Sequence, residues 1–170
     1  MRETRYTVQA SPIGPLVLAG AGERLACIGL PAGKGAVTPK PDWLRDDAAF
    51  VDARAQLGAY FDGRLNRFDL NLDPRGTPFQ HMVWAELIRI PPGRTISYGE
   101  LARRIGRPGA SRAVGAANGA NPLPIVVPCH RVIGASGALT GFAGGVETKR
   151  FLLALERGLD AASQAQLALL

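Results

Sequence analysis

The chain has 170 residues, 46% of them hydrophobic, which is enough to bury the core of one ordinary domain or of two small ones. This composition excludes wholesale disorder. No apolar stretch approaches the length of a membrane span, and the amino-terminal residues lack the apolar core of a secretory signal. We therefore expect a cytoplasmic protein with no membrane partner.

The two cysteines, Cys27 and Cys129, form neither a C-x-x-C pair nor a Cys/His cluster. This number and spacing predict free thiols in a reducing compartment and no bound metal, because structural zinc sites need closely spaced ligands. Cys27 lies in an apolar run and is expected to be a small buried hydrophobe.

Positive charge is concentrated in the second half of the chain. Residues 1–75 hold ten Lys/Arg against nine Asp/Glu, whereas residues 76–170 hold ten against five, giving the net charge of +6. One stretch contains a single acid, Glu100, and six arginines: Arg94, Arg103, Arg104, Arg107, Arg112 and Arg131. A local basic block indicates a polyanionic partner, although a solvated basic face would have the same composition.

The first third of the chain predicts a strand meander and one helix. Short apolar runs at 5–9, 16–21 and 25–30 are separated by turns rich in Gly and Pro. A Gly/Pro/Lys-rich loop at 31–43 comes next, and apolar residues at helical spacing predict a helix over 46–61. Phe68, Leu70 and Leu72 alternate with polar residues, which predicts one more strand.

The pattern changes from strands to helices at 73–76. A capping box from Thr77 to Gln80 predicts a helix up to Pro91, on which His81 is expected to face solvent. A second capping box at Ser97 predicts a helix ending at Gly106, and a third helix is predicted over about 110–118. Two short helices joined by a Gly/Pro turn are typical of a helix-turn-helix, in which the second helix reads DNA.

These elements predict two domains. Residues 1–75 are expected to form an α/β domain with a small antiparallel sheet and one helix, and residues 76–170 a mainly α domain with the helix-turn-helix. A last helix is predicted over 147–157, with Phe151, Leu152 and Leu155 on its inner face. The Ala/Leu-rich tail from Asp160 is expected to be a loosely docked extension.

The pentapeptide Pro128-Cys129-His130-Arg131-Val132 is the strongest candidate for chemistry. A thiolate is the nucleophilic form of cysteine, and an adjacent imidazole can take its proton or stabilise its charge. The pair alone does not establish a site: it follows a strand-like apolar run at 123–127, and neighbouring side chains on a strand point to opposite faces. Glycines at 134, 137, 141, 144 and 145 predict a flexible loop able to close over a site.

Several motifs in order resemble the 6-O-methylguanine-DNA methyltransferase family and span 79–158, about half of the chain. They are Ile96-Ser97-Tyr98, Ser111-Arg112-Ala113-Val114-Gly115, Asn121-Pro122, the pentapeptide with its Gly-rich loop, and the segment from Lys149 to Glu156. The segment Ser11-Pro12-Ile13-Gly14-Pro15-Leu16 also resembles the amino-terminal domain of bacterial members.

The resemblance implies irreversible, single-turnover repair of alkylated DNA without a cofactor. Cys129 would take the alkyl group from O6 of guanine, and activity on 4-O-alkylthymine is left open. His130 would relay the thiol proton through water to Glu156, and Tyr98 would donate a proton to the base. Taken alone, Glu156 would be an ordinary last-turn carboxylate and Tyr98 a packing aromatic.

The resemblance also implies how double-stranded DNA is bound. The second helix of the helix-turn-helix would enter the minor groove, and Arg112 would fill the space left by a flipped guanine. Close approach would be allowed by Ser111, Ala113 and Ala116. The substrate pocket would include Asn121, Val132, Phe142 and Ala143, although many members have tyrosine where Phe142 stands. Arg131 would bind phosphate or brace the domain interface. A monomer is expected, with cooperative binding along DNA left open.

Two other functions compete with this interpretation. A cysteine hydrolase or acyltransferase could use Cys129, His130 and Glu156, but adjacent Cys and His do not suit such an enzyme, and the helix-turn-helix would have no role. A DNA-binding regulator or damage sensor without transfer activity is the second alternative. The presence of Cys129 favours chemistry over that alternative.

Overall fold

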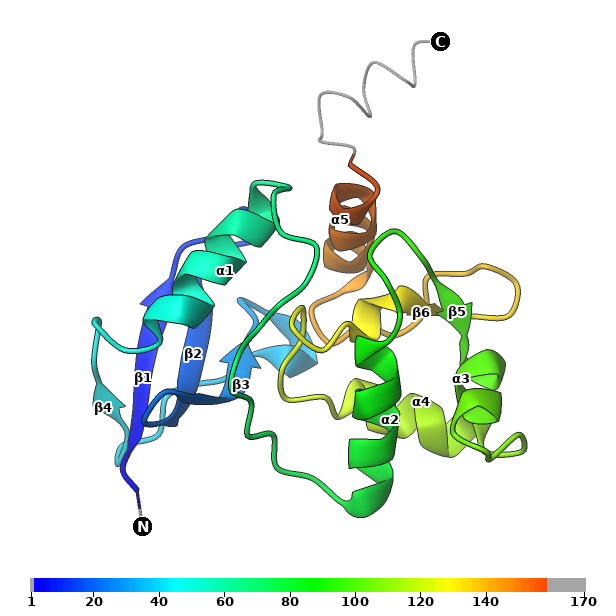
Figure 1. Ribbon diagram of the computed structural model, residues 1–170, viewed down its shortest axis with the longest axis horizontal. Helices are drawn as coiled ribbons and strands as arrows, with labels where there is room; N and C mark the ends of the chain where they lie inside the picture. The colour runs from blue at the N-terminus through cyan, green and yellow to red at the C-terminus, as the bar shows by residue number, and fades with distance from the viewer. Residues whose placement is uncertain (1, 159–170) are drawn as a thin grey trace, which may run out of the picture.

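The computed structural model describes residues 2–158, which form two halves packed side by side (Figure 1). The amino-terminal half contains a four-stranded sheet of order β3-β2-β1-β4, built from β1 (Thr4–Gln9), β2 (Leu16–Ala21), β3 (Arg24–Gly29) and β4 (Leu44–Arg45). The first three strands form an antiparallel meander, whereas β4 pairs parallel with β1. The predicted fold class is confirmed, with a sheet that is mixed rather than purely antiparallel.

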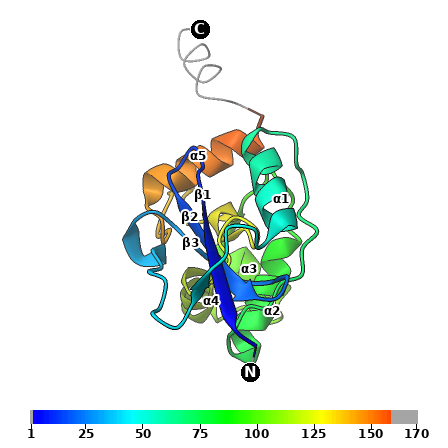
Figure 2. The ribbon, with the colours of Figure 1, turned by 90° about the vertical axis from the view of Figure 1, so that its left-hand side faces the viewer.

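Helix α1 (Val51–Phe61) lies over one face of this sheet (Figures 1 and 2). Its buried Leu57 and Tyr60 belong to the same apolar core as Leu16 and Leu25 of the strands. The helix begins later than the predicted start at 46, because Phe50 has a left-handed backbone with φ 59° and so interrupts helical geometry.

The strand predicted at Phe68, Leu70 and Leu72 does not form. Leu25 N–H donates to the Asn71 carbonyl at 2.9 Å, and Asp73 N–H donates to the Leu25 carbonyl at 2.8 Å. These bonds make one isolated parallel bridge between Leu25 and Leu72. Phe68, Leu70 and Leu72 still pack against the core. Their alternation with polar residues therefore reflects burial of one face of the segment and not hydrogen bonding as a strand of the sheet.

The carboxy-terminal half is mainly helical, as predicted. It contains α2 (Pro78–Ile88), α3 (Tyr98–Arg104), α4 (Ser111–Gly119) and α5 (Val146–Glu156), with a two-stranded parallel ladder of β5 (Ile96–Ser97) and β6 (Val132–Ile133). The capping box of Thr77 and Gln80 begins α2, and His81 is exposed as expected. The buried Trp84 of α2 donates its indole N–H to the Ala117 carbonyl of α4 at 2.8 Å, which fixes the two helices against each other.

Helices α3 and α4 form the predicted helix-turn-helix, joined by residues 105–110. The Ser97 hydroxyl accepts a hydrogen bond from Glu100 N–H at 3.0 Å, so the predicted N-cap is present. The reciprocal half of that capping box is not formed, because the Glu100 carboxylate binds Arg103 and Arg104 instead.

The run at 123–127 is a buried turn and not the predicted strand. Ile125 has φ 77°, and Val127 N–H donates to the Leu123 carbonyl at 2.9 Å. Pro122, Pro124 and Pro128 have no N–H to give to a ladder, so an apolar run punctuated in this way cannot pair as a strand. The short 3-10 helix η2 (Cys129–Arg131) follows directly, which removes the expectation that Cys129 and His130 face opposite sides of a sheet.

Main-chain hydrogen bonds join the two halves beside this turn. Ile28 N–H of β3 donates to the Pro122 carbonyl at 2.9 Å. In the 3-10 turn η1 (Gly33–Gly35), Gly35 N–H donates to the Ala143 carbonyl at 3.0 Å. Gly33 has φ 78°, and a Cβ there would lie 2.4 Å from the Ala143 oxygen, so only glycine allows this approach.

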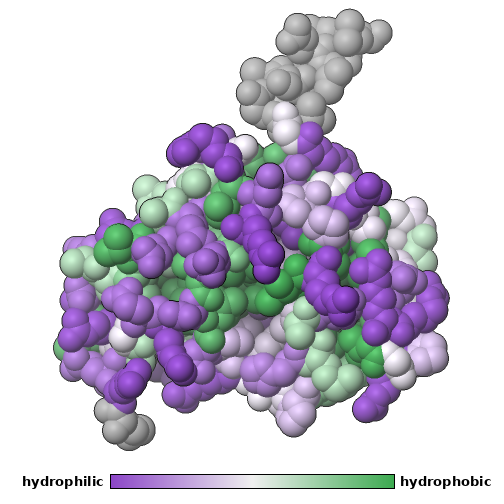
Figure 3. Space-filling view, in the orientation of Figure 1, coloured by the Kyte–Doolittle hydropathy of each residue, from purple (hydrophilic) through white to green (hydrophobic). Residues whose placement is uncertain are grey.

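The face seen in Figure 1 has hydrophobic residues gathered near the middle of the molecule, with hydrophilic residues covering most of the remainder (Figure 3). Within residues 2–158, no helix is long and apolar enough to cross a membrane. The same range contains no group of three or more His, Cys, Asp or Glu side chains placed to hold a metal ion. The tail predicted as a loosely docked extension from Asp160 lies outside the described residues.

Candidate active site

Cys129 lines a cavity of about 280 Å³ between the two halves of the molecule. The side chain is largely buried, with 6% of the residue exposed. The carboxy-terminal half contributes three residues predicted for the pocket: Asn121, Phe142 and Ala143. The amino-terminal half contributes a wall that the sequence did not predict: Cys27, Ile28, Lys34, Gly35 and Val37. Cys129 therefore borders a space large enough for a small organic group.

Burial raises the pKa of the Cys129 thiol, because a thiolate is poorly solvated there. A hydrogen bond from Asn121 and the positive charge of Lys149 oppose this effect without overcoming it. At neutral pH the thiol consequently keeps its proton in the free protein. A nucleophilic reaction at this sulfur requires a nearby base.

His130, the next residue in the chain, is the candidate for that base. Its side chain is fully buried, and Nε2 lies 2.6 Å from Oε1 of Glu156. Burial lowers the pKa of His130 and outweighs the opposing effect of Glu156, so the imidazole is neutral. Nε2 then carries the hydrogen that is donated to the carboxylate, and Nδ1 is left with a lone pair. Nδ1 has no hydrogen-bond partner among residues 2–158.

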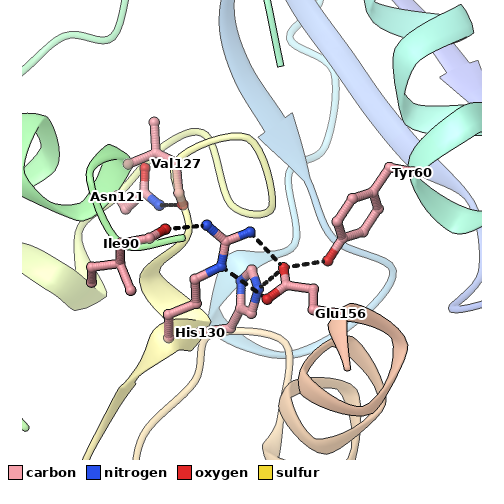
Figure 4. A network of polar contacts seen from close by, with 7 residues as sticks. Tyr60, Ile90, Asn121, Val127, His130 and Glu156 are labelled. Carbon is pink, nitrogen blue, oxygen red and sulfur yellow. Dashed lines mark hydrogen bonds and ion pairs between the residues drawn. The ribbon is translucent and has the colours of Figure 1, made fainter. Parts of the chain in front are cut away.

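Glu156, at the end of α5, is the centre of a buried polar network (Figure 4). Its side chain is 2% exposed and accepts from His130, from Arg131 and from the Tyr60 hydroxyl, the last at 2.8 Å. Burial alone would raise the pKa of this carboxyl, but the hydrogen bonds from His130 and Arg131 outweigh burial and hold the pKa at about 2. Glu156 is therefore ionised throughout the physiological range and favours an imidazolium at His130.

Arg131 is buried, and its side chain binds groups inside the carboxy-terminal half. The residue is 6% exposed, its guanidinium binds both Glu156 oxygens, and Nη1 donates to the Ile90 carbonyl. Of the two roles left open for Arg131, these contacts support the structural one. The arginine also explains how a buried carboxylate stays charged next to Cys129.

Two asparagines at the end of α4 fix the turn that carries Cys129. Asn121 Nδ2 donates to the Val127 carbonyl at 2.8 Å, and its Oδ1 accepts from Leu123 N–H at 2.9 Å. Asn118 Nδ2 donates to the Cys129 carbonyl at 3.3 Å. The helix that carries the candidate DNA-binding residues is thus tied directly to the candidate nucleophile.

Lys149 is a fully buried cation on α5. Its ammonium group donates to the carbonyls of Val132 and Thr140, which joins β6 to the Gly-rich loop. Burial lowers the pKa of Lys149 and the neighbouring Cys129 opposes this. The lysine thus places positive charge close enough to the sulfur to affect the pKa of Cys129.

Val132 and Tyr98 are not among the residues that line the cavity. Val132 is fully buried and pairs with Ile96, and its carbonyl accepts from Lys149, which leaves one lone pair free. The Cys129 carbonyl already accepts from Asn118 and from Val132 N–H. Tyr98 is half-buried on α3, and its ring lies against α4, about 3.7 Å from where a Cβ at Gly115 would lie.

The first turns of α4 present a solvent face of small and basic residues. This exposed set contains all four predicted DNA contacts: Ser111, Arg112, Ala113 and Ala116. Val114 and Ala117 lie on the opposite, buried side of the helix. Of the basic block, Arg103 and Arg104 pair with Glu100 at the surface, so part of its charge is locally neutralised.

Family models match consecutive parts of this chain. The DNA binding domain of 6-O-methylguanine DNA methyltransferase matches residues 78–158, and its ribonuclease-like domain matches residues 4–74. The chain belongs to the 6-O-methylguanine-DNA methyltransferase family. The family predicted from the motifs is confirmed.

Individual relatives agree with this family. A methylated-DNA–protein-cysteine methyltransferase of Methanosarcina acetivorans is 51% identical over 151 residues, 89% of this chain and 97% of the relative. One of Mycobacterium tuberculosis is 54% identical over 152 residues, 89% of this chain and 92% of the relative. A crystal structure of Mycobacterium tuberculosis OGT in complex with DNA has 52% identity and a TM-score of 0.87, covering 96% of this chain and 99% of that one.

The sequence motifs indicate Cys129, His130 and Glu156 but assign no role to three polar residues near them: Lys149, Asn118 and Tyr60. Lys149 had a detectable signal, since it lies three and four positions before the buried Leu152 and Leu153 and so shares their helix face. Asn118 falls on the buried side of α4 in the same way. Tyr60 had no signal, because a tyrosine on the inner face of an amphipathic helix is an ordinary core residue.

Proposed function

We propose that Cys129 is the residue that accepts the alkyl group from DNA. Direct reversal of DNA alkylation by transfer to a protein cysteine is the activity of the family, and this chain is such a methyltransferase. Of the two cysteines, Cys129 follows Asn118 and Asn121, which hold its turn in place, and it lies next to His130. Cys27 has no imidazole beside it in the sequence and lies on a strand.

The observation that carries the proposal is the unpartnered Nδ1 of His130. This atom has its lone pair free, while Nε2 is held by an ionised carboxylate at 2.6 Å. The thiol proton of Cys129 passes to Nδ1, through a water molecule, and Glu156 stabilises the resulting imidazolium. The thiolate is formed only when it is needed, which agrees with the raised pKa of the free thiol.

The transfer is a single displacement. The sulfur of Cys129 forms a bond to the alkyl carbon as the bond from that carbon to O6 of guanine breaks, and the electron pair leaves with the base. Tyr98 donates a proton to the base, so that guanine departs neutral. The product thioether has no route back to a thiol, and each molecule acts once.

The guanine lies in the cavity next to Cys129. Phe142 and Ala143 line this space, where we expect their main-chain amides to act as donors, and Phe142 has no hydroxyl. We assign recognition of the guanine amine to main-chain carbonyls around Cys129 and Val132, of which Cys129 lines the cavity.

DNA binds along the exposed face of α4 by its minor groove. Ala113 and Ala116 are small enough for close approach, Ser111 contacts the backbone, and Arg112 enters the space of the extruded base. The protein acts as a monomer with two domains that meet near 73–76. A stacked base cannot reach a sulfur in a cavity between domains, so the burial of Cys129 supports base flipping.

Mass spectrometry of tryptic peptides tests the acceptor. After incubation with duplex DNA containing 6-O-methylguanine, the Cys129 peptide gains one methyl group and the Cys27 peptide of the same digest stays unchanged. Cys129→Ser binds the same DNA and transfers nothing. A methyl group on the Cys27 peptide, or none on either after complete mixing, would refute the assignment.

Arg112→Ala tests base extrusion. The variant transfers from duplex DNA at least about tenfold more slowly, since a partner for the vacated stack is lost, but reacts normally with free 6-O-benzylguanine. Arg64→Ala, which removes an exposed arginine of the amino-terminal half, is the matched control. Equal rates for Arg112→Ala and wild type on duplex DNA would contradict the role of Arg112.

A further inference from the structure

The amino-terminal half reaches the proton relay through one side chain, Tyr60 of α1. The residue is 4% exposed, and its hydroxyl donates to Oε1 of Glu156 at 2.8 Å. The same oxygen accepts from His130 Nε2 at 2.6 Å and from Arg131 Nη2 at 2.8 Å. Figure 4 shows Tyr60 approaching the carboxylate from the side opposite to His130. One oxygen is thus shared by three donors from both halves of the molecule.

Tyr60 can act only as a donor in this arrangement. Burial raises the pKa of its hydroxyl, and the charge of Glu156 raises it further, so the phenol stays protonated. The ring is fixed by aromatic neighbours, with the Phe61 centroid at 5.2 Å and the Phe68 centroid at 5.5 Å. A rigid, permanently protonated donor defines where Oε1 lies, and Oε1 in turn orients the His130 ring.

We propose that Tyr60 is a positioning residue for alkyl transfer, through which docking of the amino-terminal half sets the geometry and basicity of the His130–Glu156 pair. The proposal rests on the proposed function of Cys129 and His130. Other contacts between the halves support it, since Ile28 binds Pro122 just before the Cys129 turn and Gly35 binds Ala143 in the Gly-rich loop. Both Pro122 and Ala143 line the same cavity as Cys129.

The chemistry fixes the direction of the effect. A hydrogen bond from Tyr60 withdraws charge from Oε1, so removing it makes Glu156 a stronger acceptor and raises the pKa of His130. The groups that face Glu156 are His130 and Arg131 from η2 and Tyr60 from α1, while Lys149 lies earlier on the same helix. In a Tyr60→Phe variant the phenylalanine ring fills the space of the tyrosine ring. His130, Arg131 and Lys149 therefore cannot move in to replace the lost hydroxyl.

The test compares Tyr60→Phe with two controls in single-turnover transfer from methylated duplex DNA, measured from pH 5 to 9. Tyr6→Phe removes a hydroxyl that makes no hydrogen bond to any residue between 2 and 158. Ala53→Gly weakens the same helix at a buried position without contacting the network. We expect Tyr60→Phe to transfer about tenfold more slowly, as for loss of one hydrogen bond to a charged group, with unchanged affinity for DNA. Its acid-side midpoint moves to higher pH, and neither control shows that shift.

Two outcomes would defeat the proposal. Tyr60→Phe with the rate and pH midpoint of wild type would show that the hydroxyl does not act on the relay. An equal slowing in Ala53→Gly, with no change of midpoint in either variant, would show that Tyr60 only stabilises the fold. Wild-type protein that carries no methyl group on Cys129 would instead refute the proposed function, so the two failures are distinguishable.

Discussion

The Arg131 guanidinium binds the Glu156 carboxylate with two nitrogens, Nε at 2.9 Å from Oε2 and Nη2 at 2.8 Å from Oε1. Both side chains are buried, at 8% and 2% exposure. A bidentate pair of this kind has fixed geometry, so it holds the carboxylate plane in which His130 must lie. The arginine of the pentapeptide therefore acts on the proposed relay through Glu156, although it does not line the cavity.

Replacing Arg131 with methionine leaves a buried carboxylate without its main counter-charge. We expect Arg131→Met to lower the free energy of unfolding by about 3–5 kcal/mol, measured by urea denaturation at pH 7. Arg103→Met is the control, because it breaks an exposed pair with Glu100 and should cost less than about 1 kcal/mol. Similar losses in the two variants would show that the buried pair is no more important than a surface pair.

The low pKa of Glu156 makes the fold sensitive to acid. Its pKa is about 2 in the folded protein against 4.5 for an unperturbed glutamate, so it contributes about 3 kcal/mol above pH 4.5 that is lost as the pH falls toward 2. His130 also destabilises the folded protein in acid. Its pKa is lowered in the folded state, so below pH 6.5 the unfolded state binds a proton more readily and is favoured. The free energy of unfolding, measured at several pH values, should therefore fall steeply below pH 6.5.

Glu156→Gln separates these contributions. The variant keeps the side-chain volume but has no carboxylate to protonate, so its stability should change less between pH 4.5 and 2 than that of wild type. Glu100→Gln is the surface control and should follow the wild-type curve closely, because its pairs with Arg103 and Arg104 are exposed to solvent. Parallel curves for wild type and Glu156→Gln would contradict a strongly lowered pKa.

Local sequence signals predicted elements where one segment decides its own structure. The capping residues Thr77 and Ser97 begin α2 and α3 as expected, because an N-cap depends on the side chain and the next three amides. The strand expected just before Cys129 is wrong, since prolines at three positions outweigh hydrophobicity there. Alternation at 68–72 could not distinguish a strand from an extended segment, because pairing depends on which strand edge is free.

The site was predictable only in part, because some of its contacts join residues that are far apart in the sequence. Cys129 and His130 are adjacent in the sequence, and although the pair alone does not establish a site, the motifs around it indicate a nucleophile and its base. Tyr60 and Glu156 are 96 residues apart, and their contact depends on how the two halves pack. No local pattern encodes such a contact, so the motifs indicate Glu156 but not Tyr60 as its partner.

Lys149 should influence the Cys129 thiol from its buried position on α5. Its charge lowers the pKa of Cys129, so Lys149→Met should raise that pKa further and slow the reaction with iodoacetamide at a fixed pH. The rate is followed against pH in a Cys27→Ala background, so that only one thiol reacts. Arg150→Gln removes a neighbouring but exposed charge on α5 and should leave the profile unchanged. The same shift in both variants would mean that general charge, rather than the buried lysine, sets the thiol pKa.

Gly33 tests whether the amino-terminal wall of the cavity matters for transfer. Gly33 and Gly63 have similar left-handed backbones, with φ 78° and 72°, so alanine at either position should cost about 1 kcal/mol of stability. A Cβ at Gly33 would also lie 2.4 Å from the Ala143 carbonyl, whereas one at Gly63 meets nothing within 4 Å. Gly33→Ala must displace η1 or the Gly-rich loop, both of which line the cavity.

We expect Gly33→Ala to slow single-turnover transfer by about tenfold or more, because small displacements of the groups around a reacting atom have large effects on rate. Gly63→Ala should transfer at the wild-type rate with a comparable loss of stability. The comparison is made with methylated and benzylated guanine in duplex DNA, since the larger group occupies more of the wall formed by Gly35 and Ala143. If both alanine variants transfer alike, contact between η1 and the Gly-rich loop is not required for the reaction.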